Sequence, residues 1–182
     1  MNGLVSLLPQ PHYDQVLQLW HSLETRFGIQ TGQISQYPPH ISWLTVNDFP
    51  LKNLEIEFRS LASKNEPFQI RTSGIGVFSR PKPVIYITVI KDDSLTKFHH
   101  QIWQLGQSHI PEDQIIQLYN PTFWLPHITL INIEPAPSNL GEILSELSYS
   151  PFQWEMTIDH IAFLCPQSGD TGMQLCQIPL GK

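Results

Sequence analysis

Two short segments of the chain carry a histidine and a hydroxyl side chain at the same spacing. His40 is followed two positions later by Ser42, and His127 is followed two positions later by Thr129, with a proline directly before each histidine. In an extended strand, side chains at positions i and i+2 lie on the same face, about 7 Å apart. Each segment therefore predicts a strand that presents one imidazole and one hydroxyl to a common side.

Such a set of side chains suits acid–base chemistry on a phosphodiester. Because the pKa of an imidazole is near ~6.5, one histidine can accept a proton and the other can donate one at neutral pH. The hydroxyls can donate to the phosphate oxygens, and a protonated imidazole stabilises the negative charge of the transition state. The predicted reaction is in-line attack on phosphorus by water or a ribose hydroxyl, without a cofactor. Metal binding is disfavoured because neither motif has a carboxylate or third histidine at ligand spacing.

The two histidine segments belong to a repeat. They lie 87 positions apart, and the tripeptide Pro67-Phe68-Gln69 recurs 84 positions later as Pro151-Phe152-Gln153. Apolar residues at helical spacing precede and follow each histidine segment. These residues are Val16, Trp20, Leu23 and Phe27, then Leu51, Leu54, Phe58 and Leu61 in the first half, and Leu95, Phe98, Ile102 and Leu105, then Leu140, Ile143, Leu144 and Leu147 in the second. Each half is predicted to contain a helix, a histidine strand, a second helix and a hairpin.

Both predicted hairpins contain a change in their apolar alternation. Apolar residues move from even to odd positions around Gly74 in the first hairpin and around His160 in the second. Such a change indicates a bulge or a strong bend in the strand. The return strands are predicted at 84–90 and 173–180, and Pro179 favours an edge position for the second of them.

Together these elements predict an α+β fold with a bilobal internal duplication. Two curved antiparallel sheets are expected to face each other across a central cleft, with the helices on the outside. The motifs at 40–42 and 127–129 would then meet in that cleft. Because no Gly/Ser linker or low-complexity tract separates the halves, we take residues 1–182 as a single domain with two pseudo-symmetric lobes.

The composition excludes several classes of protein. Hydrophobic residues make up 41% of the 182 residues, which excludes a disordered chain. The chain has 10 Lys and Arg against 16 Asp and Glu, a formal net charge of −6, so contacts with nucleic acid are expected to be local. The absence of a long apolar run and of a charged leader predicts a cytoplasmic protein with no membrane partner. Cys165 and Cys176 are predicted to be reduced thiols.

Five residues near the motifs are candidates for substrate contact. Tyr37, Phe123 and Trp124 stand beside the histidine segments, where an aromatic ring can stack on a base. Tyr86 lies on the face of its strand opposite the apolar residues, which predicts that it lines the cleft. Arg80 lies at a hairpin tip, where it can hold a flanking phosphate.

Three other histidines are given structural interpretations. His99 and His100 fall within a predicted helix and are interpreted as part of its solvated face. His160 marks the bend of the last hairpin and is interpreted as a buried or bulge residue.

The duplicated His-x-Ser/Thr pattern resembles the two-histidine (2H) phosphoesterases, in particular their bacterial 2′-5′ RNA ligase-like and RNA cyclic phosphodiesterase branch. The resemblance extends from the first strand to the last hairpin. It implies a bilobal fold, catalysis by His40 and His127 with Ser42 and Thr129 on the phosphate, and metal-independent opening of 2′,3′-cyclic phosphates to 2′-phosphates. For some members it also implies reversible 2′-5′ joining of RNA ends. The acidic composition and the few arginines of this chain disfavour the joining of long RNAs.

Two other functions remain open from the sequence. The chain could act on other cyclic phosphodiesters, such as ADP-ribose cyclic phosphate, or it could be a nucleotide- or RNA-binding module without turnover. In each case the expected partner is a nucleotide or an RNA terminus. No obligatory protein partner is expected, and a monomer is favoured.

Overall fold

The computed structural model describes residues 2–29, 37–79, 83–132, 139–166 and 173–182. The elements of the first half are β1 (Asn2–Leu7), α1 (His12–Phe27), β2 (His40–Val46), the 3-10 turn η2 (Leu51–Leu54), α2 (Glu55–Ala62) and β3 (Phe68–Phe78). Those of the second half are β4 (Val84–Val89), α3 (Asp93–His109), the 3-10 turns η3 (Glu112–Gln114) and η4 (Gln117–Tyr119), β5 (His127–Asn132), α4 (Leu140–Leu147), β6 (Glu155–Ile158), β7 (His160–Pro166) and β8 (Met173–Pro179). β4, predicted as the return strand of the first hairpin, is counted with the second half because it pairs with the second histidine strand, β5.

The strands form two antiparallel four-stranded sheets, in the orders β2-β1-β7-β8 and β5-β4-β3-β6. We call them the His40 sheet and the His127 sheet. In each sheet the histidine strand lies at the edge and pairs with the strand that opens its own half, β1 or β4. The third strand comes from the other half, because β7 pairs with β1 and β3 pairs with β4. The fold class predicted from the sequence is confirmed, and the halves are interlocked.

The histidine strands carry matching irregularities. The register between β1 and β2 skips Trp43, and the register between β4 and β5 skips Leu130. Both skipped residues lie three positions after the motif histidine. A bulge of this kind increases the local twist and bends the strand. The repeat therefore extends from the sequence to the fine geometry of the strands that bear the motifs.

The predicted bends in the hairpins are also present. β3 pairs with β6 through 68–71 and with β4 through 72–78, and its register with β4 shifts around Gly74, whose φ is +113°. In the second half the chain changes sheets at Asp159, between β6 in the His127 sheet and β7 in the His40 sheet. β8 is an edge strand, as Pro179 predicted.

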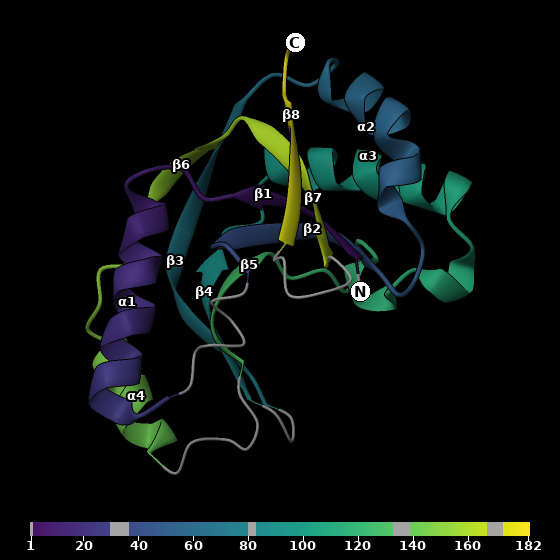
Figure 1. Ribbon diagram of the computed structural model, residues 1–182. Coiled ribbons are helices and arrows are strands. Elements are labelled where there is room, and N and C mark those ends of the chain that lie inside the picture. Colours follow the sequence, from purple (N-terminus) through teal and green to yellow (C-terminus); the bar gives the residue numbers. More distant parts are fainter. Residues whose placement is uncertain (1, 30–36, 80–82, 133–138, 167–172) are drawn as a thin grey trace.

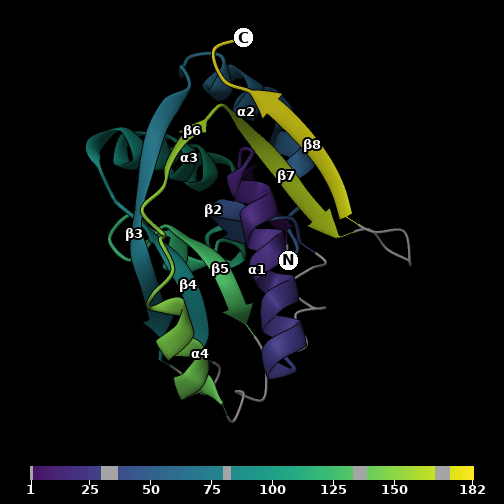
Figure 2. The same cartoon turned by 90° about the vertical axis from the view of Figure 1, so that its left-hand side faces the viewer.

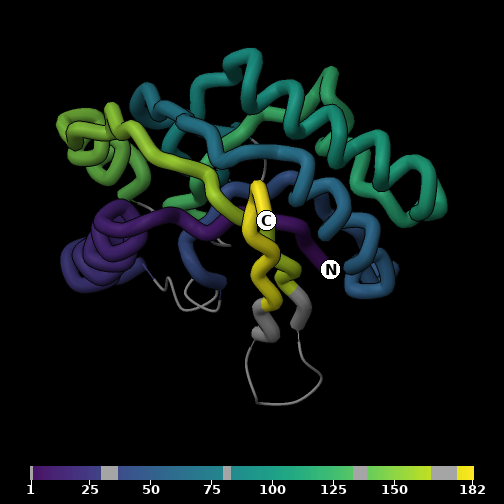
Figure 3. Tube along the Cα trace, turned by 90° about the horizontal axis from the view of Figure 1, so that it is seen from above, coloured from purple at the N-terminus to yellow at the C-terminus, as the bar shows by residue number. Residues whose placement is uncertain are grey.

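The helices form two pairs on opposite sides of the molecule (Figures 1 and 2). α1 lies beside α4, and Arg26 of α1 forms an ion pair with Glu146 of α4. α2 lies beside α3, and these two helices contact strands of the His40 sheet. Figure 3, viewed from above, shows the same separation. Each pair combines one helix from each half, as expected for halves related by a pseudo-twofold axis.

Two smaller findings concern the helices and the last sheet. The stripe predicted as one helix from Leu51 onward is divided, because Leu51–Leu54 forms a 3-10 turn before α2 begins.

Cys176 on β8 is a free, half-buried thiol, and the side chain of Cys165 lies outside the described part of the structure. Within the described residues no helix has the length and apolar character needed to cross a membrane.

Candidate active site

The motif residues alternate between the two faces of their strands. His40 and Ser42 on β2 have half-buried side chains, while the residues after each of them are fully buried. His127 and Thr129 on β5 follow the same pattern. The apolar neighbours anchor each strand in the core, which leaves an imidazole and a hydroxyl on the opposite face.

Each histidine is oriented by a backbone carbonyl two residues before it. Nδ1 of His40 lies 2.6 Å from the carbonyl oxygen of Pro38, and Nδ1 of His127 lies 2.7 Å from that of Leu125. A carbonyl can only accept, so Nδ1 donates in both contacts. In the neutral ring this leaves Nε2 as the unprotonated nitrogen, which is the tautomer that a general base requires.

Burial shifts both histidines toward the neutral form. Desolvation lowers the pKa of His40, the hydrogen bond to Pro38 opposes this, and a positive charge on His127 lowers that pKa further. Desolvation likewise lowers the pKa of His127, against the hydrogen bond to Leu125. The two rings therefore influence each other electrostatically.

A small pocket contains residues from both motifs. His40 of β2 and Thr129 of β5 line it together, with Trp20, Tyr37, Pro38 and Pro39. A histidine of one half and a hydroxyl of the other half are thus brought to one place.

The ring of His127 lies against an aromatic pair. The ring centroids of Phe78 and Tyr86 are each 5.1 Å from that of His127 and 4.3 Å from each other. Gly76, paired with Tyr86 across the sheet, makes room for this ring, because a Cβ there would lie 2.5 Å from it. The site is therefore asymmetric, with aromatic rings packed around His127.

The chain as a whole was compared with known protein families. A family model described as the 2′-5′ RNA ligase superfamily matches residues 10–170. The chain belongs to this superfamily.

The same comparisons find a named relative and solved structures with a similar fold. A protein of Bacillus cytotoxicus that is named as a phosphoesterase is 26% identical over 137 residues, which cover 74% of each chain. The structure of TT0787 from Thermus thermophilus is similar with a TM-score of 0.64, at 16% identity, over 99% of this chain and 97% of that one. That of E. coli LigT complexed with 3′-AMP has a TM-score of 0.59, at 12% identity, over 100% and 98%. At these identities the solved structures show the shared fold.

The aromatic residues predicted to contact the substrate differ in how far they are exposed to solvent. Tyr37 lines the pocket of His40, and Phe123 is 64% exposed, so both rings are accessible to a ligand. Trp124 is only 2% exposed, so the expectation that it stacks on a base is wrong; its ring packs in the core. Arg80 lies outside the described residues.

The structural histidines also differ from one another. His100 is exposed as predicted, but His99 is fully buried, and its interpretation as a solvated residue is wrong. The reason is tertiary, since Trp124 from a distant loop stacks on the ring of His99. His160 accepts a hydrogen bond from the backbone of Leu7 at Nε2, which fits its predicted structural role at the bend.

Two site residues were missed by the sequence analysis. Phe78 was not singled out, and Trp20 was considered only as part of a helical stripe. Phe78 lies two positions after Gly76, the partner of Tyr86 across the sheet, so alternation along β3 could have placed its ring on the same face as Tyr86. Trp20 reaches the pocket through helix packing, for which the sequence has no local signal.

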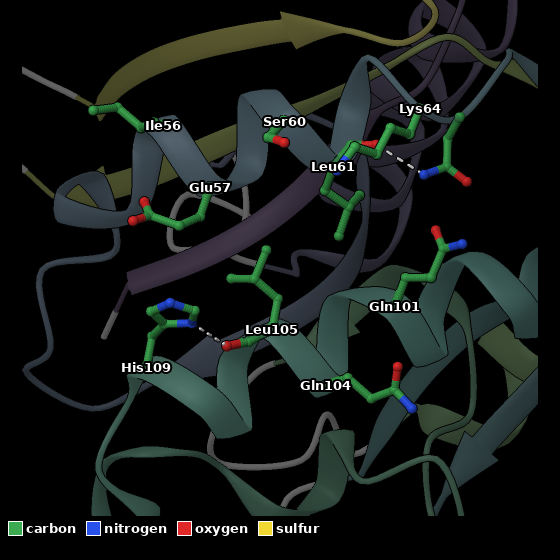
Figure 4. A pocket seen from close by; sticks show the side chains of 10 residues that line it. Ile56, Glu57, Ser60, Leu61, Lys64, Gln101, Gln104, Leu105 and His109 are labelled. Carbon is green, nitrogen blue, oxygen red and sulfur yellow. Dashed lines mark hydrogen bonds between the residues drawn. The ribbon is translucent and has the colours of Figure 1, made fainter.

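The described residues contain no group of three or more His, Cys, Asp or Glu side chains placed to hold a metal ion. A separate groove of about 470 Å³ lies between α2 and α3 (Figure 4). Its lining includes Ile56, Leu61 and Lys64 from α2 and the turn after it, and Gln101 and His109 from α3. No motif residue lines this groove, so it is separate from the smaller pocket that contains His40 and Thr129.

Proposed function

We propose that this protein is a metal-independent phosphodiesterase that opens 2′,3′-cyclic phosphates of nucleotides or RNA ends to 2′-phosphates. The observation that carries the proposal is the matched orientation of His40 and His127, each with Nδ1 on a carbonyl and Nε2 left for chemistry. A protein that only binds a nucleotide would need no more than one imidazole, in any orientation. Two imidazoles in the same tautomer supply both halves of a proton exchange.

The reaction uses one histidine as base and the other as acid. The neutral Nε2 of the base removes a proton from water while the water oxygen forms a bond to phosphorus. The bond from phosphorus to O3′ breaks in line, and the protonated Nε2 of the acid delivers its proton to O3′. The products are a 2′-phosphate and a free 3′-hydroxyl. Ser42 and Thr129 donate to the non-bridging oxygens, where negative charge accumulates.

A nucleotide is the substrate class that the surroundings favour. The rings of Tyr37 and Tyr86 stand near the histidines, and the exposed ring of Phe123 is four residues before His127 in the chain; each can stack on a base. E. coli LigT, which shares the fold, has been solved with 3′-AMP, NADP+ and ATP. A single cyclic phosphate also suits an acidic chain, because it does not require an extended basic surface.

The test is incubation with 2′,3′-cyclic mononucleotides and with an oligonucleotide that ends in a cyclic phosphate, in the presence of EDTA. We expect a 2′-phosphate product and turnover that is unchanged by chelation. His40→Ala and His127→Ala should each lower kcat by at least ~10²-fold, the usual contribution of one acid–base group. Ser42→Ala and Thr129→Ala should have smaller effects. Full activity in either histidine variant, or loss of activity in EDTA with recovery in zinc, would refute the mechanism.

The same assay separates the alternatives. Faster turnover of ADP-ribose cyclic phosphate than of any nucleoside 2′,3′-cyclic phosphate would assign the other substrate class. Saturable binding of nucleotides with no product would indicate a binding module. Joined 2′-5′ products from RNA ends would show a ligation reaction, in which the 5′-hydroxyl of a second RNA replaces water as the nucleophile and O3′ is again the leaving group.

A further inference from the structure

The segment 110–126, which we call the bridging segment, links α3 to β5 and runs along the outer edge of β2. Because β2 is an edge strand, backbone groups on its outer side have no strand partner within its own sheet. The bridging segment supplies partners. The amide of Ile116 donates to the carbonyl of Thr45 at 3.0 Å, and the amide of Asn47 donates to the carbonyl of Gln114 at 2.9 Å. The segment that ends at the second motif is thus bonded to the strand of the first.

Trp124 connects this segment to the first motif. Its indole Nε1 donates to the backbone carbonyl of Ser42 at 3.1 Å. Ser42 carries one of the motif hydroxyls, and Trp124 stands three residues before His127. One hydrogen bond therefore connects the backbone of the first motif to the residues that lead into the second.

The indole ring is held firmly in place. The ring of His99 stacks on it with centroids 3.6 Å apart and planes 5° apart, and Trp43 packs against it at 5.6 Å. Lys91 donates to the carbonyls of Trp124 and Pro121. Burial, with the nearby charge of Lys91, lowers the pKa of His99 to about 3, so this ring is neutral when it stacks. These contacts fix the position of the indole between β2 and the residues that precede His127.

We propose that Trp124 is a positioning residue that fixes the separation of His40 and His127. This inference rests on the proposed function, because in-line transfer needs both imidazoles at one phosphate. A displacement of about 1 Å can cost roughly 10²-fold in rate when two groups must act together. The geometry of Trp124 thus assigns it to the alignment of the two lobes rather than to base stacking.

The variant that isolates this role is Trp124→Phe, which keeps an aromatic ring in the core but removes the N–H donor. We expect kcat on a 2′,3′-cyclic mononucleotide to fall by roughly 10- to 100-fold, while KM changes much less, as for an interaction that acts in the transition state. The matched control is Trp154→Phe, where the indole packs against His12 and Phe152 and does not line the pocket of His40 and Thr129. This control should retain wild-type kcat.

A second measurement does not depend on turnover. NMR titration gives the pKa of His127 with and without His40→Ala, and the difference reports the electrostatic coupling of the two rings, which decreases with their separation. We expect this difference to shrink in Trp124→Phe and to persist in Trp154→Phe. An unchanged difference together with an unchanged kcat in folded Trp124→Phe would overturn the proposal. If the wild-type protein has no turnover, the proposed function fails, and an unchanged coupling would then by itself overturn the role of Trp124.

Discussion

For single residues, the strongest constraint on the chemistry is the tautomer of each motif histidine. Pro38 and Leu125 hold Nδ1 of the two rings through their carbonyls, and both stand two residues before the histidine they orient. The backbone just before each histidine strand therefore orients the imidazole in the same way in both halves. Because a carbonyl cannot donate, the neutral ring has one available tautomer, and the proton to be exchanged is always at Nε2.

The pH dependence follows from the direction of the two pKa shifts. In the proposed mechanism activity needs one neutral and one protonated histidine, so kcat/KM should be bell-shaped, with its maximum midway between the two apparent pKa values. Desolvation lowers the pKa of both His40 and His127 below 6.5. We therefore expect the maximum below pH 6.5, measured as kcat/KM on a cyclic mononucleotide across pH 4–9. A maximum well above pH 7 would contradict the paired-histidine assignment.

The aromatic pair beside His127 gives a second prediction for a single residue. Gly76→Ala would place a Cβ 2.5 Å from the ring of Tyr86 and displace that ring. If the ring stacks on the base, a loss of ~1–3 kcal/mol is expected, seen as a rise in KM of roughly 5- to 100-fold. Tyr86→Phe, which keeps the ring, should leave KM near the wild-type value. Equal effects of the two substitutions on KM would show that the hydroxyl, and not the ring, makes the contact.

Among the elements, β3 has the most demanding geometry, because it serves two neighbours in succession. It pairs with β6 at its start and with β4 at its end, and Gly74 lies at the change with a φ of +113°. Residues that carry a side chain rarely adopt such a φ, so the bend depends on glycine at this position. The bulges at Trp43 and Leu130 have a related effect on the histidine strands.

Gly74→Ala tests this bend. Although no atom lies within 4 Å of a Cβ at this position, the backbone strain should lower the free energy of unfolding by ~1–3 kcal/mol. The control is Gly141→Ala in α4, where the Cβ also meets nothing within 4 Å and the backbone is helical; it should stabilise the protein by up to about 1 kcal/mol. Urea denaturation measures both. Equal effects of the same sign would contradict the strain argument.

Over the whole molecule, the two halves exchange their third strands. Removing the second half would take β4 and β6 from β3, and would take β7 from β1. A separated half would therefore expose long unpaired strand edges and half of the continuous core. This exchange supports the prediction that the chain is one domain, although its two repeats are easy to recognise in the sequence.

Expression of residues 1–79 alone tests this interlocking. We expect no cooperative unfolding transition at low protein concentration, as judged by circular dichroism during thermal denaturation. Any folded form should be concentration-dependent, because β3 of one copy can then pair with β1 of another as β3 pairs with β4 in the full chain. A cooperatively folded monomer of this fragment, shown by analytical ultracentrifugation, would refute the interlocking as a requirement for folding. The full-length chain is the control and is expected to be monomeric.

The sequence by itself determined the repeat, the histidine strands, the helices that flank them and the bends around Gly74 and His160, because all of these follow from the spacing of residues along one element. Only the tertiary structure decided the exchange of third strands, the burial of His99 and Trp124, and the aromatic pair around His127. Burial and ring contacts depend on which distant segment packs against a residue. Trp124 and His99 come from different segments, and neither has a local pattern that specifies the other.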